Sequence, residues 1–126
     1  MYNYLKAIIE DVKEAIKGYN TTEFADREEF EERLNDDLWV SDSVTGNASG
    51  SYHCNSNKSM ECVLDNMDLL EEMCGEFGID NETIGKKFLE GAWEWMDVSI
   101  RCYLLGQAIS EALDEMEDDL IFSEEE

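Results

Sequence analysis

Apolar residues recur every three or four positions along most of the chain, which is the spacing of one buried face of an α-helix. Residues 2–17 have such a face, and Gly18 follows it as a helix stop. Asp26 and Glu29 have the spacing of a capping box, which marks the start of a helix with Phe30, Leu34 and Leu38 on its apolar face. The N-terminal third of the chain therefore predicts two amphipathic helices.

Three further helices are predicted in the second half of the chain. Residues 57–74 form one, with apolar positions at Met60, Val63, Leu64, Met67, Leu70 and Met73/Cys74. Asp80 with Thr83 starts a short helix with apolar residues Ile84, Phe88 and Leu89. Gly91 then allows a bend before a long helix over residues 92–118. Because that helix is apolar on more than one face, we expect the other helices to surround it.

Residues 40–57 interrupt the helical pattern, because Ser, Gly, Asn and Thr replace the regularly spaced apolar residues. They predict a long loop, with room for a short β-hairpin near Val44 and Tyr52. A loop of this length is often functional, although a plain surface crossover between helices is the more common case. We therefore expect a mostly all-α protein of four to five helices packed around the long C-terminal helix. Residues 1–122 would form a single helical domain and residues 123–126 an acidic tail.

The four cysteines fit a reducing environment. Cys62, Cys74 and Cys102 lie within helical patterns, where reduced cysteine packs as a small hydrophobe, and Cys54 lies in the loop. The N-terminus lacks the basic segment and apolar run of a signal peptide. Charged residues interrupt the most apolar stretch, around residues 93–113, so it does not predict a membrane span. The sequence therefore predicts a cytoplasmic protein.

Charge changes this picture more than any other property. The chain has 9 Lys and Arg against 32 Asp and Glu, a formal net charge of −23. Residues 21–41, 60–80 and 111–126 hold nearly all of the excess, and the last two blocks contain no Lys or Arg. Such an excess repels itself, and solubility alone requires far less of it. It favours a cationic partner, while solvated outer faces of amphipathic helices remain the alternative explanation.

Carboxylate spacing raises one metal-dependent alternative. Glu94 with Asp97, and Glu111 with Asp114, have the spacing seen in all-α nucleotide pyrophosphohydrolases. Both pairs lie on the one predicted long helix, about 25 Å apart at about 1.5 Å per residue. They therefore cannot share a metal ion within one protomer, and we expect neither a metal site nor a cofactor.

Other chemistry is equally disfavoured. His53 and Cys54 are adjacent, so in extended backbone their side chains point to opposite faces. The chain contains no glycine-rich phosphate-binding motif and no nucleophile-elbow motif. Its charge repels phosphate, which argues against direct binding of nucleic acid. The sequence therefore argues against an enzyme.

Three polar or aromatic residues of the long helix have structural explanations. Arg101 follows Asp97 by four residues, which predicts an ion pair that satisfies a charge in the core. Trp93 and Trp95 flank Glu94, and we expect both rings to pack in the core, with exposure in a groove as the alternative.

Two stretches resemble small acidic proteins of bacterial mobile elements and phages. They are Asp42–Tyr52 (DSVTGNASGSY) and Asp97–Gly106 (DVSIRCYLLG), and the similarity extends over about half of the chain. In size and charge the chain is also similar to DNA-mimic inhibitors of restriction or CRISPR systems. The second resemblance implies an inhibitor that occupies a nucleic-acid site, and neither brings a catalytic or binding residue with it.

We therefore expect a non-enzymatic acidic interaction protein, a DNA mimic whose partner is a basic, nucleic-acid-binding protein. A homodimer is compatible with the sequence. The candidate partner-binding residues are Glu71, Glu72, Glu76, Glu111, Asp114, Glu115, Glu117, Asp118 and Asp119. One alternative is an accessory binding module that uses loop residues Asp42, Thr45, Asn47, Tyr52 and His53. A less favoured alternative is a nucleotide hydrolase in which carboxylates hold Mg²⁺ or Mn²⁺.

Overall fold

A computed structural model describes residues 3–39, 44–45 and 56–123, and every regular element in those residues is helical. The α-helices are α1 (Tyr4–Ile16), α2 (Arg27–Trp39), α3 (Ser56–Asp65), α4 (Met67–Phe77), α5 (Asn81–Glu90) and α6 (Trp93–Met116). Two short 3₁₀-helices, η1 (Thr21–Glu23) and η2 (Glu117–Asp119), follow α1 and α6. The predicted all-α class is confirmed. Of the residues predicted to allow a hairpin, only Val44 and Thr45 lie in the described part of the chain, and they form a turn.

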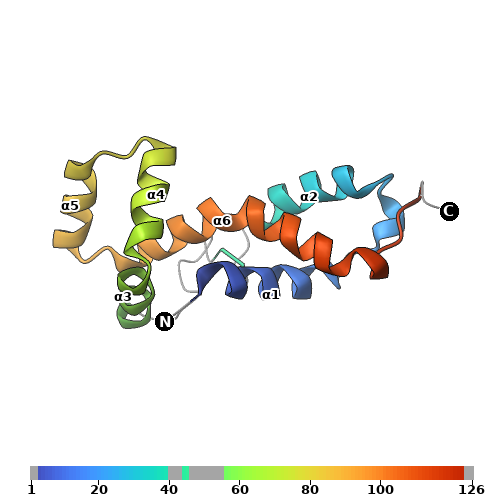
Figure 1. Ribbon diagram of the computed structural model, residues 1–126, viewed down its shortest axis with the longest axis horizontal. Coiled ribbons are helices and arrows are strands. Elements are labelled where there is room, and N and C mark those ends of the chain that lie inside the picture. The colour runs from blue at the N-terminus through green and yellow to red at the C-terminus, as the bar shows by residue number, and fades with distance from the viewer. Residues whose placement is uncertain (1–2, 40–43, 46–55, 124–126) are drawn as a thin grey trace.

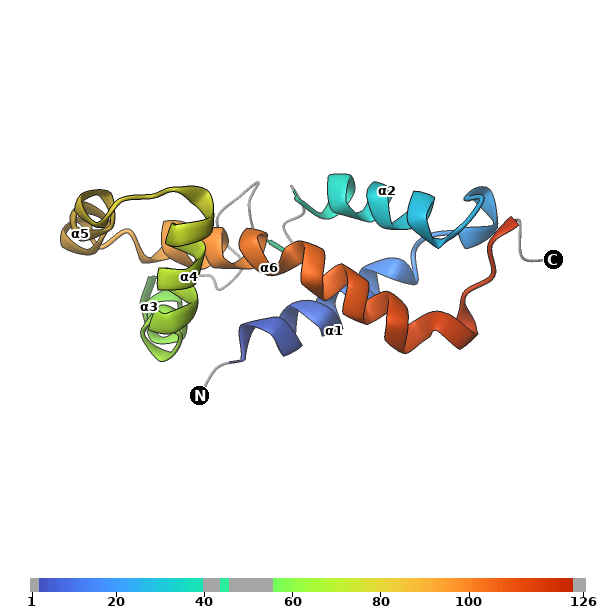
Figure 2. The ribbon, with the colours of Figure 1, turned by 45° about the horizontal axis from the view of Figure 1, so that its top comes forward.

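Helix α6 is the spine of an elongated molecule (Figure 1). Helix α1 runs beside the middle and the C-terminal part of α6, and α2 lies along its C-terminal half, whereas α3, α4 and α5 gather around its N-terminal half. Turning the molecule separates α1 and α2 onto different sides of α6 (Figure 2). The surrounded position predicted for the long C-terminal helix is therefore confirmed.

Local signals set most helix ends. The Glu29 amide donates to Oδ1 of Asp26 at 3.0 Å, and the Thr83 amide donates to Oδ1 of Asp80 at 2.7 Å, so both predicted N-caps form. Gly91 ends α5 in the left-handed region, with φ at 67°, which a residue with a side chain adopts only under strain. The bend predicted before the long helix lies at this glycine.

The predicted helix over residues 57–74 is instead two helices, which raises the number of α-helices to six in the described residues. The break is at Asn66, whose backbone leaves the helical region with φ −129° and ψ 41°. Its side-chain amide donates to the carbonyl of Cys62 at 2.9 Å, a local bond that competes with the helix ladder. The break also changes which face is buried. Leu64 and Met67, predicted to point inward, are 50% and 41% exposed.

The hydrophobic core runs along α6 and ends in an aromatic cluster beside the C-terminal end of this helix. Phe30 of α2 packs against Phe24, Tyr19 and Phe122, with ring centroids 4.9, 5.5 and 5.8 Å away. Buried residues recur at every turn of α6 between Met96 and Leu113. Neighbouring positions such as Leu104 and Leu105 are both buried, so more than one face of the helix is covered.

Matched leucine truncations test this arrangement of the core. Leu105 is 1% exposed on α6, whereas Leu89 is 90% exposed on α5. We expect Leu105→Ala to lower the free energy of unfolding by about 2–5 kcal/mol, because it removes buried contacts and leaves a cavity. Leu89→Ala should change it by less than about 0.5 kcal/mol. Urea denaturation of both variants measures the difference, and equal losses would contradict the packing described.

Candidate functional site

A cluster of buried polar groups is centred on the carboxylate of Asp97 on α6. The hydroxyl of Tyr4 on α1 donates to its Oδ1 at 2.6 Å, and the hydroxyl of Ser59 on α3 donates to its Oδ2 at 3.2 Å. Nε of Arg101 lies 3.5 Å from Oδ1, and both charged side chains are almost completely buried. The predicted ion pair is therefore confirmed, and three helices meet at one carboxylate.

The electrostatics of this cluster favour a structural role. Burial, followed by the nearby Asp97 carboxylate, raises the pKa of Tyr4 far above its usual range, so the phenol stays neutral and donates. Burial and Asp97 also raise the pKa of the neighbouring Cys62 to about 11, which keeps this thiol protonated and unreactive. The Arg101 guanidinium lies 5.3 Å from the centre of the Tyr4 ring, a cation–π distance. The cluster holds α1, α3 and α6 together.

Acidic residues gather where α2 runs beside the end of α6. Arg27 of α2 binds Asp114 at 2.6 Å and also donates to the carbonyl of Ser110 at 3.0 Å. The segment after η2 is tied to the residues before α2, because the Thr21 hydroxyl donates to the carbonyl of Ile121 at 2.6 Å. We call the exposed carboxylates of this region the acidic end; its members are Glu28, Glu29, Glu32, Asp36, Asp114, Glu115, Glu117, Asp118 and Asp119.

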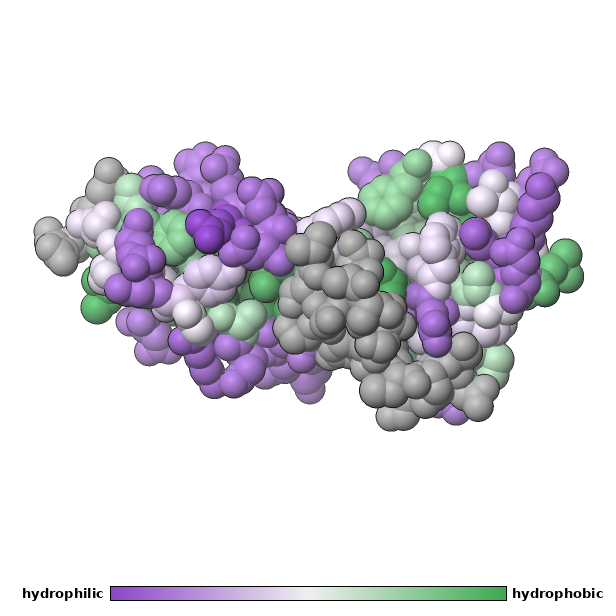
Figure 3. Space-filling view, turned by 180° about the vertical axis from the view of Figure 1, so that it is seen from behind, coloured by the Kyte–Doolittle hydropathy of each residue, from purple (hydrophilic) through white to green (hydrophobic). Residues whose placement is uncertain are grey.

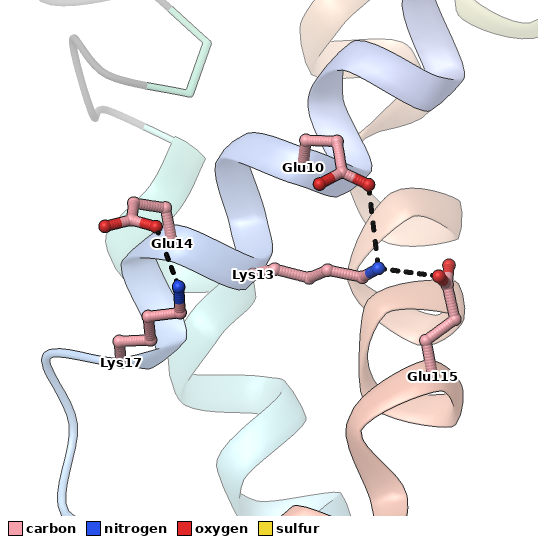
Figure 4. A network of polar contacts seen from close by, with 5 residues as sticks. All are labelled: Glu10, Lys13, Glu14, Lys17 and Glu115. Atoms are coloured by element: carbon pink, nitrogen blue, oxygen red, sulfur yellow. Dashed lines mark hydrogen bonds and ion pairs between the residues drawn. The ribbon is translucent and has the colours of Figure 1, made fainter.

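The predicted partner-binding residues of this region are not equivalent. Lys13 of α1 donates to Glu115 at 2.6 Å and also lies 3.6 Å from Glu10 (Figure 4). Asp114 is paired with Arg27 in the same way. Glu111 is half-buried, and its Oε2 is buried and accepts no hydrogen bond within the described residues. Residues 117–119 of η2 are exposed and form no such ion pair with any residue that the structure describes.

The remaining predicted carboxylates lie elsewhere. Glu71, Glu72 and Glu76 are exposed on α4, which packs near the N-terminal half of α6, away from α2 and η2 (Figure 1). The structure therefore divides the predicted set between the two ends of the molecule. The sequence could not show this, because helical spacing gives the face of a residue but not the position of its helix.

Of the loop candidates, Asp42, Asn47, Tyr52 and His53 lie outside the described residues. Thr45 is fully buried, and its hydroxyl donates to the carbonyl of Trp39 at 2.9 Å. This position gives Thr45 a structural contact within the fold and does not present it to a partner.

The structure also contains two open grooves, of which the sequence suggested only the one at Trp95, as an alternative. One, of about 340 Å³, is lined by Trp39, Phe77 and Trp95 among others, so the core packing predicted for Trp95 is wrong and the groove alternative holds. Trp93 is partly buried and packs against Phe88 at 5.3 Å. The other groove, of about 620 Å³, lies between α4 and α5. Apolar side chains appear at the surface over this end of the molecule (Figure 3). The sequence did contain a signal for the break before α4, because asparagine, the residue at position 66, disfavours the interior of a helix.

No three His, Cys, Asp or Glu side chains are grouped as metal ligands in residues 3–39, 44–45 and 56–123. The carboxylates of the two motif-like pairs all lie on α6, as expected. None of the described helices combines the length and apolar character of a membrane-spanning segment. Cys62, Cys74 and Cys102 are buried, as the sequence predicted.

Comparison of the chain with protein-family models, with curated proteins and with solved structures finds no match. The residues and geometry described above are therefore the basis for assigning a function.

The raised pKa of Tyr4 gives a test of the buried cluster. Tyr4→Phe removes the hydroxyl that donates to Asp97, so we expect a loss of about 1–3 kcal/mol in the free energy of unfolding at about pH 8. The unfolded phenol ionises near pH 10, and the stability due to a raised folded pKa is lost as pH rises above that value. The difference between wild type and variant should therefore shrink at about pH 10.5. Urea denaturation at both pH values measures it, and a difference that does not change with pH would contradict the assignment.

Proposed function

We propose that this chain is an acidic interaction protein that binds a cationic surface of a partner protein through the acidic end. In the finer form of the proposal it is a DNA mimic, and the partner surface is one that otherwise holds nucleic acid. The observation that supports this most directly is the pairing of α2 with the end of α6 and η2, since it joins two acidic blocks distant in sequence.

The spacing of charges supports the finer form. Carboxylates on one face of a single helix recur about every 4.5–6 Å along the axis, which is sparser than the phosphates of one DNA strand at about 3.4 Å. Two acidic elements side by side approach that density. Arg27 fixes this pairing because it contacts both Asp114 and Ser110 on α6.

The cations near this surface are already engaged within the fold. Lys13 binds Glu115, Arg27 binds Asp114, and Arg33 lies 2.9 Å from Asp37 on α2. The first two pairs link α1 and α2 to α6, the third lies within α2, and together they offset only part of the charge. The carboxylates of η2 and the outer face of α2 therefore present a negative field, which attracts a cationic partner and weakens as salt screens it.

Neutralising η2 tests the proposal more sharply than reversing the whole block, because reversal would also break the pairs to Lys13 and Arg27. The test variant is Glu117→Gln/Asp118→Asn/Asp119→Asn. Wild-type and variant chains are immobilised, exposed to lysate of the source cells at about 50 mM salt, and eluted with duplex DNA. We expect the wild type to release nucleic-acid-binding proteins and the variant to release about tenfold less.

The control variant is Glu61→Gln/Glu76→Gln/Glu82→Gln, which removes the same charge from exposed positions at the opposite end of α6. It should bind as the wild type does, and wild-type capture should disappear at about 500 mM salt. Equal losses in the two variants would show that net charge alone retains these proteins. That result, or capture that DNA does not displace, would refute the proposal.

A further inference from the structure

At the end of the molecule opposite η2, apolar side chains of α5 remain exposed to solvent. None of its side chains is buried, and Leu89 is 90% exposed. Ile84 and Phe88 face the space between α4 and α5, where Met67 and Leu70 of α4 line the other wall. This groove has a volume of about 620 Å³ and is open to solvent. An exposed apolar groove of this kind is typical of an interaction site.

The charges on the groove all have one sign. Asp68 and Glu71 are the charged residues that line it, and α4 contains no basic residue. Lys86 and Lys87 lie on α5 outside the lining, and Lys87 is directed to Glu90 at 3.9 Å and to the Trp95 ring at 5.0 Å. A ligand in the groove would therefore meet apolar side chains at its floor and carboxylates at its rim.

We propose that the α4–α5 groove binds an amphipathic helix of a partner protein, one that places Lys or Arg beside its apolar side chains. Helix-in-groove recognition uses apolar anchors at positions i, i+3 or i+4, and i+7. Helix α4 has 11 residues and is therefore about 16 Å long, which accommodates about three turns of such a helix. The cationic side chains would reach Asp68 and Glu71 at the rim.

The negative charge of the groove favours a cationic helix over a second copy of the chain as its ligand. Two copies that met at this groove would bring together two acidic helices, each with Asp68, Glu71, Glu72 and Glu76, and two chains of net charge −23. Like charges opposed at close range cost free energy, whereas a cationic helix gains from the same field. The groove is distinct from the acidic end, so an interaction there goes beyond the proposed function.

Two glycines allow a test that leaves the fold intact. Gly75 on α4 lines the groove, and Gly85 on α5 does not. An added Cβ meets no atom within 4 Å at either position, and both backbones are helical. Gly75→Leu fills the groove, Gly85→Leu adds the same side chain outside it, and both substitutions favour the helix.

The probe is a fluorescein-labelled peptide of Leu, Lys and Ala, about 14 residues long, with leucines at i, i+3, i+7 and i+10. A scrambled peptide of the same composition has the same charge but no apolar face. Fluorescence anisotropy should show that the wild type and Gly85→Leu bind the amphipathic peptide alike. Gly75→Leu should bind it at least about tenfold more weakly, and the scrambled peptide should bind weakly to all three proteins.

A rim variant tests the charge argument. Asp68→Asn/Glu71→Gln should weaken binding of the amphipathic peptide more than Glu76→Gln/Glu82→Gln, which removes the same charge from positions outside the groove. The η2 variant should bind the peptide as the wild type does, so failure here is distinguishable from failure of the proposed function. No binding, equal binding of both peptides, or no effect of Gly75→Leu would overturn the proposal. Self-association in sedimentation that Gly75→Leu abolishes would assign the groove to a second copy and would also overturn it.

Discussion

The carboxylate of Asp97 is the point at which three helices are joined by polar contacts. Tyr4 of α1 and Ser59 of α3 donate to its two oxygens, and Arg101 balances its charge one turn along α6. Removing one charged partner from such a buried set leaves the other charge without compensation, which costs far more than the set gains over apolar residues. The cluster therefore specifies how α1 and α3 pack against α6, and the remaining helices pack against α6 in turn.

The chain has few basic residues, and their placement explains how it folds with so large an acidic excess. The basic residues that pair across helices, Arg27 with Asp114 and Lys13 with Glu115, act where acidic elements must lie together. Helix α4, with four acidic residues and no basic one, lies at the far end and so adds little repulsion to the acidic end. What is left exposed is negative at both ends, with an apolar groove at one of them. These two features are the basis of the two interactions with cationic partners that we propose.

Local signals allowed much of the fold to be predicted from the sequence. The caps at Asp26 and Asp80 and the stop at Gly91 depend on neighbours within a few residues, and all three formed. The break at Asn66 was missed because the apolar spacing continues across it; Met67, the first residue after the break, is exposed and lines the α4–α5 groove. The separation of the candidate partner-binding residues between the two ends of the molecule could not be predicted. It depends on contacts between distant residues, such as the pair Lys13–Glu115 separated by 102 positions.

The proposed function requires that position, and not net charge alone, makes the acidic end a binding surface. An NMR titration of the isotope-labelled protein with a short Arg-rich peptide at about 50 mM salt tests it most directly. We predict that amide shifts concentrate on η2 and on the outer face of α2, around Glu28, Glu32 and Asp36, and saturate together. Shifts spread over every acidic segment in proportion to its charge, with α4 responding as strongly as η2, would contradict the claim.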